Sequence, residues 1–370
     1  MVKKRIRIHF LINSMSGGGA EKVLSNLLNA LSNEKYELYL TAFWGGVNEI
    51  FLPETIKYRI LFHKRSLFSR FFLNLPKIFL ARFIFRYSED ICISFLEGTP
   101  TIILSKLNKK TKKIAFVHTD CSKGGTFDRM FKTKEKCIKC YRSFDEVCFV
   151  SEDTKNAFEK KYERSRKNVV VHNVLNLMEI KEKSECKIDD YSKTSNYRFI
   201  VVGRLSAPKN IMRVLEAALE LQKKYSFEIK ILGTGEEYDL LNSFKKSNAI
   251  ECVDFLGYRQ NPYPYIKQSD MLICSSNFEG YSTVCCEAIY LGVPVLTTNC
   301  SGMKEILKDG RYGLIVENDT RSFIDGFERI IKNPGIIDRF RKNILMDITD
   351  SSFSNLTQYE QLFERVLKDI

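Results

Sequence analysis

The sequence lacks any uncharged apolar run approaching the roughly 18 residues that a membrane-spanning helix needs. The segment from Met1 to Phe10 alternates cations with apolar residues and has no long apolar core, so we expect no signal peptide. The 11 cysteines are odd in number and scattered through apolar stretches, which argues against a disulfide framework and indicates reduced thiols. We therefore expect a cytoplasmic protein without a spanning helix.

The sequence also lacks the residue clusters of a metal centre. Cys137 and Cys140 form a CxxC pair, but no second pair and no nearby His completes a zinc site. We interpret the pair as two residues of a helix and expect no metal in the site. No nucleic-acid-binding motif accompanies the basic residues, so we expect no nucleic-acid partner.

Composition indicates a globular chain with an uneven charge. The 370 residues are 44% hydrophobic and 28% charged, which favours two folded domains. Met1–His172 contains 32 Lys and Arg against 17 Asp and Glu, whereas the remainder contains 26 against 28. The whole excess of the net charge of +13 therefore lies in the first half. This half either attracts an anionic partner, such as a membrane or a phosphorylated substrate, or is simply a solvated surface.

Short apolar strands alternate with amphipathic helices in two series, which predicts an α/β fold of two Rossmann-like, doubly wound domains. The polar segment 173–196 separates the series and is the predicted linker. We predict an N-terminal domain over 1–172, a C-terminal domain over 197–352, and a helix in 353–370. In such sheets ligands bind outside the carboxyl ends of the strands, here in a cleft between the domains. The main predicted strands are Ile6–Ile12, Glu37–Phe43, Ile91–Leu96, Lys113–Val117, Glu146–Val150, Phe199–Val202, Phe227–Leu232, Val253–Leu256, Met271–Cys274 and Val295–Thr298.

The stretch Leu67–Arg86 interleaves aromatic and aliphatic residues with four cations and contains no acidic residue. This composition suits a helix lying at a membrane interface. It equally suits a helix packed on the core with its arginines extending to water. The composition does not separate these two interpretations.

The most specific motif is E-G-x-S-x-x-x-x-E-A-x-x-x-G-x-P-V, which begins at Glu279. Ser282 is a suitable N-cap, so a helix is predicted to begin beside it. The first free amides of that helix, near Thr283, can hold a phosphate together with the helix dipole. Glu287 lies more than one turn inside the helix, where hydrogen bonds from sugar hydroxyls would offset the cost of burying a carboxylate.

A second motif follows the first strand of the second series. The segment Gly203–Asn210 is a junction between strand and helix that carries Arg204 and Lys209. A guanidinium offers paired donors and an ammonium offers a point charge, so together they suit a diphosphate.

With these motifs the chain resembles the retaining GT-B-fold glycosyltransferases of family 4, the glycosyl transferases group 1. The resemblance covers nearly the whole chain and is sharpest over Phe199–Val316, where Gly233–Glu236 and Ser301–Glu305 also match. The first half matches through Ser16–Glu21 and Val117–Asp120. The fold implied is GT-B, two Rossmann-like domains facing across a cleft, with the C-terminal helix crossing back to the first domain. The stretch His172–Asn176 departs from the family pattern because it lacks a glycine, which leaves the local turn open.

The resemblance implies a role for each candidate residue. Arg204 and Lys209 neutralise the diphosphate of a nucleotide sugar, and Glu287 binds ribose hydroxyls. Glu279 binds the transferred sugar, and His118 lies near the reacting carbon. The predicted catalytic residues are Glu279, His118, Arg204 and Lys209, and the predicted donor-binding residues are Gly18, Arg204, Lys209, Glu279, Gly280, Tyr281, Ser282, Thr283 and Glu287. No cofactor or metal is implied.

We expect a retaining hexosyltransferase of surface polysaccharide or glycoconjugate biosynthesis. It moves a hexose or N-acetylhexosamine from a nucleotide diphosphate sugar, UDP-linked, to a saccharide acceptor linked to polyprenyl diphosphate. The basic domain 1–172 predicts a peripheral location at the inner face of the cell membrane, against its anionic surface. A nucleotide-sugar 2-epimerase of the same fold is the enzyme alternative. A basic nucleic-acid-binding protein is the alternative from another class, and it leaves both motifs without a use.

Overall fold

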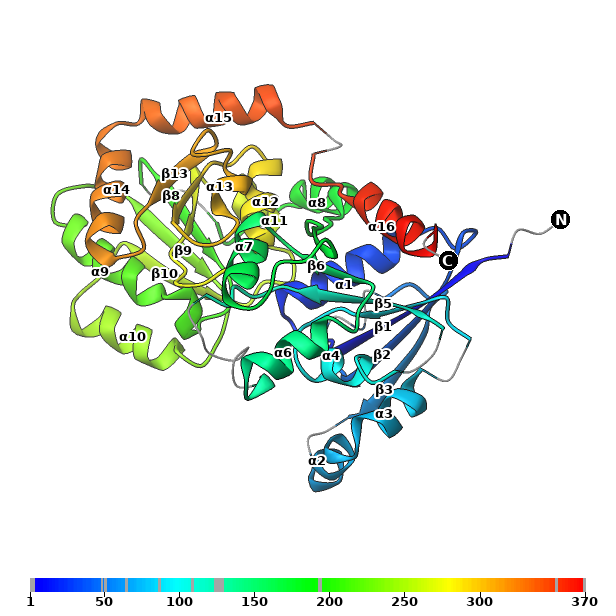
Figure 1. Cartoon of the computed structure of the whole chain (residues 1–370). Helices are drawn as coiled ribbons and strands as arrows, with labels where there is room; N and C mark the ends of the chain where they lie inside the picture. The colour runs from blue at the N-terminus through cyan, green and yellow to red at the C-terminus, as the bar shows by residue number, and fades with distance from the viewer. Residues whose placement is uncertain are drawn as a thin grey trace. The chain divides into compact units, whose positions relative to one another are not determined.

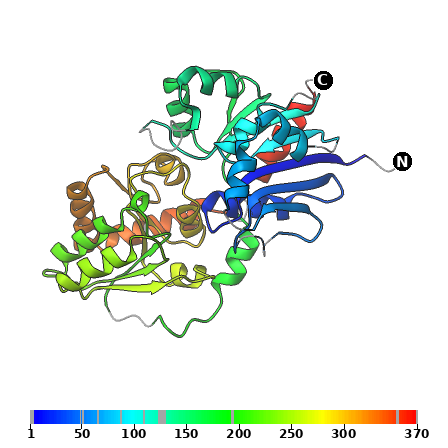
Figure 2. The same cartoon turned by 90° about the horizontal axis from the view of Figure 1, so that it is seen from below.

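The computed structural model describes residues 4–47, 49, 52–63, 66–85, 88–107, 110–122, 130–191, 195–349 and 352–368. The chain divides into two compact units (Figures 1 and 2). Unit 1 is Met1–Leu175 with Asn355–Ile370, and unit 2 is Asn176–Ser354. Each unit is built around a parallel sheet with helices on its faces, so the α/β prediction is confirmed.

Unit 1 contains a parallel sheet in the order β3-β2-β1-β4-β5-β6-β7. Apolar strand residues alternate between two buried faces, as expected for a parallel sheet. One face packs against α1 and α16, and the other packs against α3, α4, α6 and α7. The elements are β1 (Ile6–Ser14), α1 (Gly19–Ala30), β2 (Tyr36–Trp44), β3 (Lys57–Phe62), α2 (Leu67–Asn74), α3 (Lys77–Ile84), β4 (Ile91–Ser94), α4 (Thr99–Leu104), β5 (Lys112–Val117), α6 (Lys134–Tyr141), β6 (Glu146–Phe149), α7 (Glu152–Lys161), β7 (Asn168–Val170) and α16 (Leu356–Lys368).

The C-terminal helix α16 belongs to unit 1, as predicted. Tyr359, Leu362, Phe363 and Val366 recur at helical spacing and are buried in the core that also contains strand β1. The apolar stripe of α16 therefore completes one face of the first sheet.

Unit 2 contains a parallel sheet in the order β10-β9-β8-β11-β12-β13. Helices α9, α10, α14 and α15 contribute to one core of this unit, and α12 contacts β11 and β12. The elements are α8 (Leu177–Ser184), β8 (Arg198–Val202), the 3-10 helix η2 (Ala207–Lys209), α9 (Ile211–Leu221), β9 (Glu228–Leu232), α10 (Tyr238–Ser247), β10 (Val253–Gly257), α11 (Tyr263–Lys267), β11 (Met271–Cys274), α12 (Thr283–Tyr290), β12 (Val295–Thr298), α13 (Met303–Ile306), β13 (Gly313–Val316), α14 (Thr320–Lys332) and α15 (Gly335–Asp347).

The segment 173–196, predicted as a linker, differs from that expectation. It contains α8, which packs against α11 because Leu177 and Ile180 are buried. Tyr191 is also buried, and its hydroxyl lies 2.7 Å from Ser269 Oγ. The boundaries between the units fall after Leu175 and after Ser354.

The stretch Leu67–Arg86 forms two helices, α2 and α3, where one was predicted. Pro76 precedes α3 and disfavours helical geometry at Leu75, so the chain turns there. Arg86 lies outside the described residues.

Candidate functional site

The loop after β8 directs its two cations to different partners. The Nε of Arg204, which is largely exposed, lies 3.3 Å from Glu236 Oε2. Asn210 adopts the left-handed conformation, with φ 45° and ψ 56°, so the chain passes directly from η2 into α9. The Nζ of Lys209 lies 2.6 Å from Glu279 Oε1. The structure therefore brings Lys209 and Glu279 together and pairs Arg204 with Glu236.

Two glycines in the loop that follows β9 lie against the backbone of the Arg204 loop. Gly233 has a φ of 146°, and a Cβ there would collide with the carbonyl oxygen of Gly203. A Cβ on Gly235 would collide with the carbonyl oxygen of Leu205. The amide of Leu205 donates to the carbonyl of Thr234 at 3.0 Å. The segment Gly233–Gly235 is therefore a turn whose glycines allow the two backbones to approach closely.

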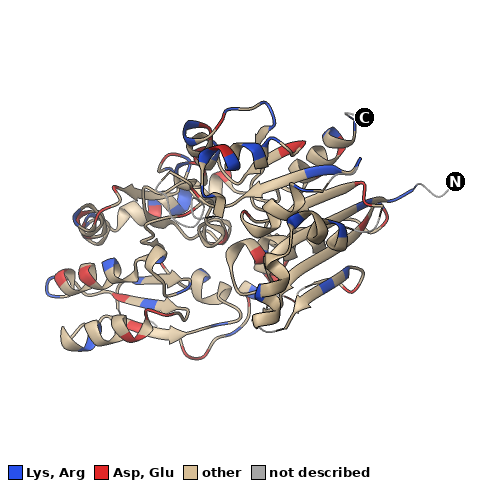
Figure 3. Cartoon of the chain, turned by 60° about the horizontal axis from the view of Figure 1, so that its bottom comes forward, with Lys and Arg blue, Asp and Glu red and all other residues tan. Residues whose placement is uncertain are grey.

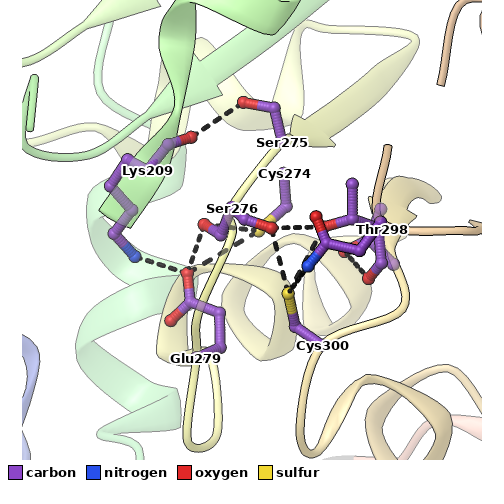
Figure 4. Close-up of polar contacts among 9 residues, drawn as sticks. Lys209, Cys274, Ser275, Ser276, Glu279, Thr298 and Cys300 are labelled. Atoms are coloured by element: carbon purple, nitrogen blue, oxygen red, sulfur yellow. Dashed lines mark hydrogen bonds and ion pairs between the residues drawn. The ribbon is translucent and has the colours of Figure 1, made fainter. Parts of the chain in front are cut away.

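Glu279 is held by the loop that follows β11 (Figure 4). Ser276 Oγ donates to Glu279 Oε1 at 2.6 Å, so this oxygen accepts hydrogen bonds from both Ser276 and Lys209. Thr298 Oγ1 donates to the carbonyl of Ser276 at 2.6 Å, and Cys300 Sγ donates to it at 3.0 Å. Loops at the carboxyl ends of β8, β11 and β12 thus converge on Glu279, at the edge where parallel sheets bind ligands.

Arg213 joins these loops from inside α9 and was missed by the sequence analysis. Its side chain is buried, and its Nη1 donates to the carbonyl of Ser275 at 3.0 Å and to Asn318 Oδ1 at 2.9 Å. Its Nη2 donates to Asn277 Oδ1 at 3.1 Å. The backbone amide of Asn277 in turn donates to the carbonyl of Pro208 at 2.8 Å. An arginine on the otherwise apolar, buried face of an amphipathic helix is the sequence signal that could have identified it.

The Glu279 carboxylate keeps the Lys209 side chain positively charged at this edge of the sheet. Burial by itself lowers the pKa of Lys209, but the adjacent Glu279 carboxylate raises it above its ordinary value of 10.5. Lys209 is therefore a cation at neutral pH. A hydrogen bond with Cys285 lowers the pKa of the Cys274 thiol to about 7, against burial and the Glu279 charge, which both raise it.

Helix α12 begins directly after the Glu279 loop. Ser282 occupies the N-cap position, but its side chain makes no capping hydrogen bond, and its buried Oγ has no hydrogen-bond partner among the described residues. The first-turn amides near Thr283 are therefore not capped by Ser282, and a phosphate is a suitable acceptor for them. Gly280 is buried, and burial raises the pKa of the Tyr281 phenol well above its ordinary value. Glu287 is buried in the second turn of the same helix.

In unit 1 the predicted residue Gly18 is the N-cap of α1. Glu21 lies in the first turn of that helix, and Ser16 Oγ donates to Glu21 Oε1 at 3.1 Å. Burial raises the pKa of the Glu21 carboxyl. The glycine-rich loop is therefore tied to the start of α1 by a carboxylate.

His118 follows β5 and is positioned by Glu97, a second residue that the sequence analysis missed. Glu97 is buried after β4; it accepts a hydrogen bond from the amide of His118 at 2.9 Å and another from Thr119 Oγ1. The His118 ring lies 5.1 Å from the Phe95 ring, centroid to centroid. Its Nε2 has no hydrogen-bond partner within the described ranges. Burial lowers the pKa of His118 despite the nearby Glu97 carboxylate, so the ring is neutral at pH 7.

The described residues contain no group of three or more His, Cys, Asp or Glu side chains that could hold a metal ion. No helix in the described part of the chain is long and apolar enough to cross a membrane.

Comparison with known proteins shows what this chain is similar to. Residues 184–345 match the family model described as glycosyl transferases group 1. The chain is 29% identical over 323 residues to an amylovoran biosynthesis glycosyltransferase of Erwinia amylovora, covering 84% of this chain and 85% of the relative. It is 27% identical over 351 residues to an α-1,4-N-acetyl-D-galactosaminyltransferase of Campylobacter jejuni, covering 92% of each chain. That relative is named for a substrate linked to undecaprenol through a diphosphate.

Solved structures show the same fold. The Anabaena protein HepE in complex with UDP and glucose aligns over 99% of this chain and 100% of its own, with a TM-score of 0.79 and 16% identity. The lipopolysaccharide glycosyltransferase WaaG aligns over 96% of this chain and 99% of its own, with a TM-score of 0.72 and 13% identity. The sheet order agrees with these structures: the chain has the GT-B fold, and its residues 184–345 match the glycosyl transferases group 1.

Proposed function

We propose that this protein is a retaining, metal-independent glycosyltransferase. It transfers a hexose or N-acetylhexosamine from a UDP-linked sugar to a saccharide carried on polyprenyl diphosphate, at the inner face of the cell membrane. The observation that carries the proposal is the Lys209–Glu279 pair beside the start of α12, in a unit that matches the family model. The names of the amylovoran and Campylobacter relatives support a role in surface polysaccharide or glycoconjugate synthesis.

The cations act on the leaving group. When the bond between the anomeric carbon and the diphosphate oxygen breaks, negative charge grows on the nucleoside diphosphate. Lys209, the exposed guanidinium of Arg204 and the first amides of α12 stabilise that charge. Because Lys209 and the first amides of α12 are fixed in place before the reaction, a divalent metal ion is not needed for this stabilisation.

The carboxylates act on hydroxyl groups. Glu279 already accepts hydrogen bonds from Ser276 and Lys209 through Oε1, and a sugar hydroxyl can donate to Oε2. Glu287 binds the ribose hydroxyls, and the backbone of Gly280, Tyr281 and Thr283 contacts the sugar and phosphate.

Gly18 and His118 of unit 1 complete the proposed set. A neutral His118, whose buried Nε2 has no hydrogen-bond partner among the described residues, can exchange hydrogen bonds with the transferred sugar, and Gly18 allows the backbone to approach phosphate or acceptor. The acceptor oxygen attacks the face that the diphosphate leaves, through a short-lived oxocarbenium ion. Because attack and departure occur on the same face, the anomeric configuration is retained. The acceptor proton passes to the departing phosphate oxygen.

A nucleotide screen followed by a transfer assay tests the proposal. UDP should raise the unfolding temperature more than ADP or GDP, because ligand binding stabilises the folded state by mass action. The enzyme treated with EDTA should then release UDP only when a polyprenyl-diphosphate saccharide is present, and NMR should show an α-linked product from an α-linked donor. Release of UDP without glycosylated product, or epimerised donor without an acceptor, would contradict the proposal.

A further inference from the structure

Helices α2 and α3 of unit 1 expose large apolar side chains that the unit does not bury. Leu67 is 83% exposed, Phe71 67% and Phe79 63%. Folded soluble proteins rarely expose a contiguous apolar patch unless the patch binds something. The exposed members, which we call the α2–α3 patch, are Leu67, Phe68, Phe71, Ile78, Phe79 and Phe83.

Ring contacts link the two helices. Phe72 of α2 lies 5.6 Å from Phe83 of α3, centroid to centroid, and 5.4 Å from Phe62 of β3. Phe62 also lies 6.2 Å from Phe68. The patch therefore lies over a connected aromatic layer.

The opposite side of this layer is anchored to unit 1. Leu80, Ala81 and Ile84 of α3 are buried in the core. A capping box between Ser66 and Ser69 fixes the start of α2. In Figure 1 both helices lie at the periphery of unit 1, beyond β3. The patch is thus an outer face of a folded element.

The charge around the patch has one sign. Thr55 to Ser88 contains eight Lys and Arg and no Asp or Glu. Arg70 and Arg82 are exposed on the two helices, and the Arg59 guanidinium lies 5.2 Å from the centre of the Phe83 ring. Cationic residues occur throughout unit 1, whereas unit 2 carries both signs in nearly equal number (Figure 3).

This combination selects one occupant. Aromatic side chains with flanking arginines match the boundary between acyl chains and anionic headgroups of a lipid bilayer. A second copy of the patch would bring like charges together, which opposes self-association through this face. We propose that the α2–α3 patch docks unit 1 on an anionic phospholipid surface, with the aromatic rings at the acyl boundary and Arg70 and Arg82 at the phosphates. The inference rests on the proposed function, since a lipid-linked acceptor is reached at that surface.

Cosedimentation of the full chain with vesicles tests the inference. The wild-type protein should bind mixed phosphatidylcholine–phosphatidylglycerol vesicles at least about tenfold more tightly than pure phosphatidylcholine vesicles, and high salt should weaken that binding. The double variant Phe71→Ser/Phe79→Ser should lose about tenfold or more of this affinity. Arg70→Gln/Arg82→Gln should reduce the preference for the anionic vesicles and its salt dependence.

The matched control is Leu240→Ser/Leu345→Ser, which removes two equally exposed apolar side chains from unit 2. It should bind vesicles as the wild type does. UDP binding, measured by calorimetry without lipid, should be unchanged in every variant. A failure of the membrane inference is thereby distinguished from a failure of the proposed function.

Three outcomes would overturn the inference. The first is a wild-type protein that does not bind the anionic vesicles at low salt. The second is an equal loss of binding in the control. The third is a wild-type dimer in sedimentation without lipid that Phe71→Ser/Phe79→Ser converts to monomer, which would assign the patch to a second copy of the chain.

Discussion

Lys209 Nζ and Glu279 Oε1, on residues 70 apart in the chain, lie 2.6 Å apart at the carboxyl edge of the second sheet. The Glu279 side chain is 11% exposed and that of Lys209 31%, so the pair is only partly screened by water. Lys209 remains a cation at neutral pH because the adjacent Glu279 carboxylate raises the pKa of its ammonium group. Under the proposed function, the donor diphosphate binds the Lys209 ammonium at this position.

Removal of either partner should separate binding from turnover. Lys209→Met should weaken UDP binding by about tenfold or more, because it removes a charge-assisted hydrogen bond. Glu279→Gln should leave UDP affinity within a few-fold but reduce kcat by about a hundredfold, since Glu279 is proposed to bind the transferred sugar. Calorimetry and initial rates measure the two effects. Lys332→Met is the matched control, because Lys332 pairs with Glu328 on the surface of α14. Unchanged UDP affinity in Lys209→Met would remove Lys209 from the site.

Arg213 should act as a positioning residue. Arg213→Met removes a donor from the Ser275 carbonyl and from Asn318 Oδ1, and one of the two donors of Asn277 Oδ1, which keeps the bond from Asn210. We expect the free energy of unfolding to fall by about 3 kcal/mol and the KM for the donor to rise. In Arg213→Lys the KM for the donor should lie between the values for Arg213→Met and the wild type, because lysine returns a cation to the same place. A variant as stable as the wild type, with an unchanged KM, would contradict this role.

The close approach of two backbones at Gly233 predicts that alanine is far more destabilising there than at Gly335. Gly233→Ala should destabilise unit 2 by about 2 kcal/mol or more and weaken UDP binding, because the new methyl group collides with the Gly203 carbonyl and φ is unfavourable. Gly335→Ala is the control: a Cβ there meets nothing within 4 Å, and the position begins α15. It should be neutral or slightly stabilising. Chemical denaturation of both variants measures the difference.

The neutral state of His118 predicts an acid-dependent loss of stability. Burial lowers its native pKa below the ordinary value of 6.5, so the unfolded chain binds more protons below that pH. The contribution of neutral His118 to the free energy of unfolding is fully present above pH 6.5. It falls as the pH drops from 6.5 toward the native pKa, by at most about 1.4 kcal/mol per pH unit.

His118→Phe should flatten that dependence, because it removes the buried imidazole. Denaturation between pH 5 and pH 8 gives the comparison. Parallel pH profiles for the wild type and His118→Phe would show that His118 does not titrate in this way.

The sequence by itself determined the alternation of elements and the two motifs. Strands such as Met271–Cys274 and Val295–Thr298 agree with the prediction to the residue, because a buried parallel strand is a short apolar run ended by turn residues. The charge asymmetry and the amphipathic stripe of α16 were equally visible, since both are properties of residue order. Strands β3, β7 and β13 were missed, since they contain more exposed or half-buried residues.

Only the tertiary structure decided which side chains meet. Strands β8 and β11 are neighbours in the second sheet, so the loops that follow them carry Lys209 and Glu279 to the same place. The Arg213 hydrogen bonds, the Gly233 contact and the outward direction of Phe71 and Phe79 depend on the same packing. A linear pattern records the period of burial along each element. It does not record strand order, and strand order sets which loops lie side by side.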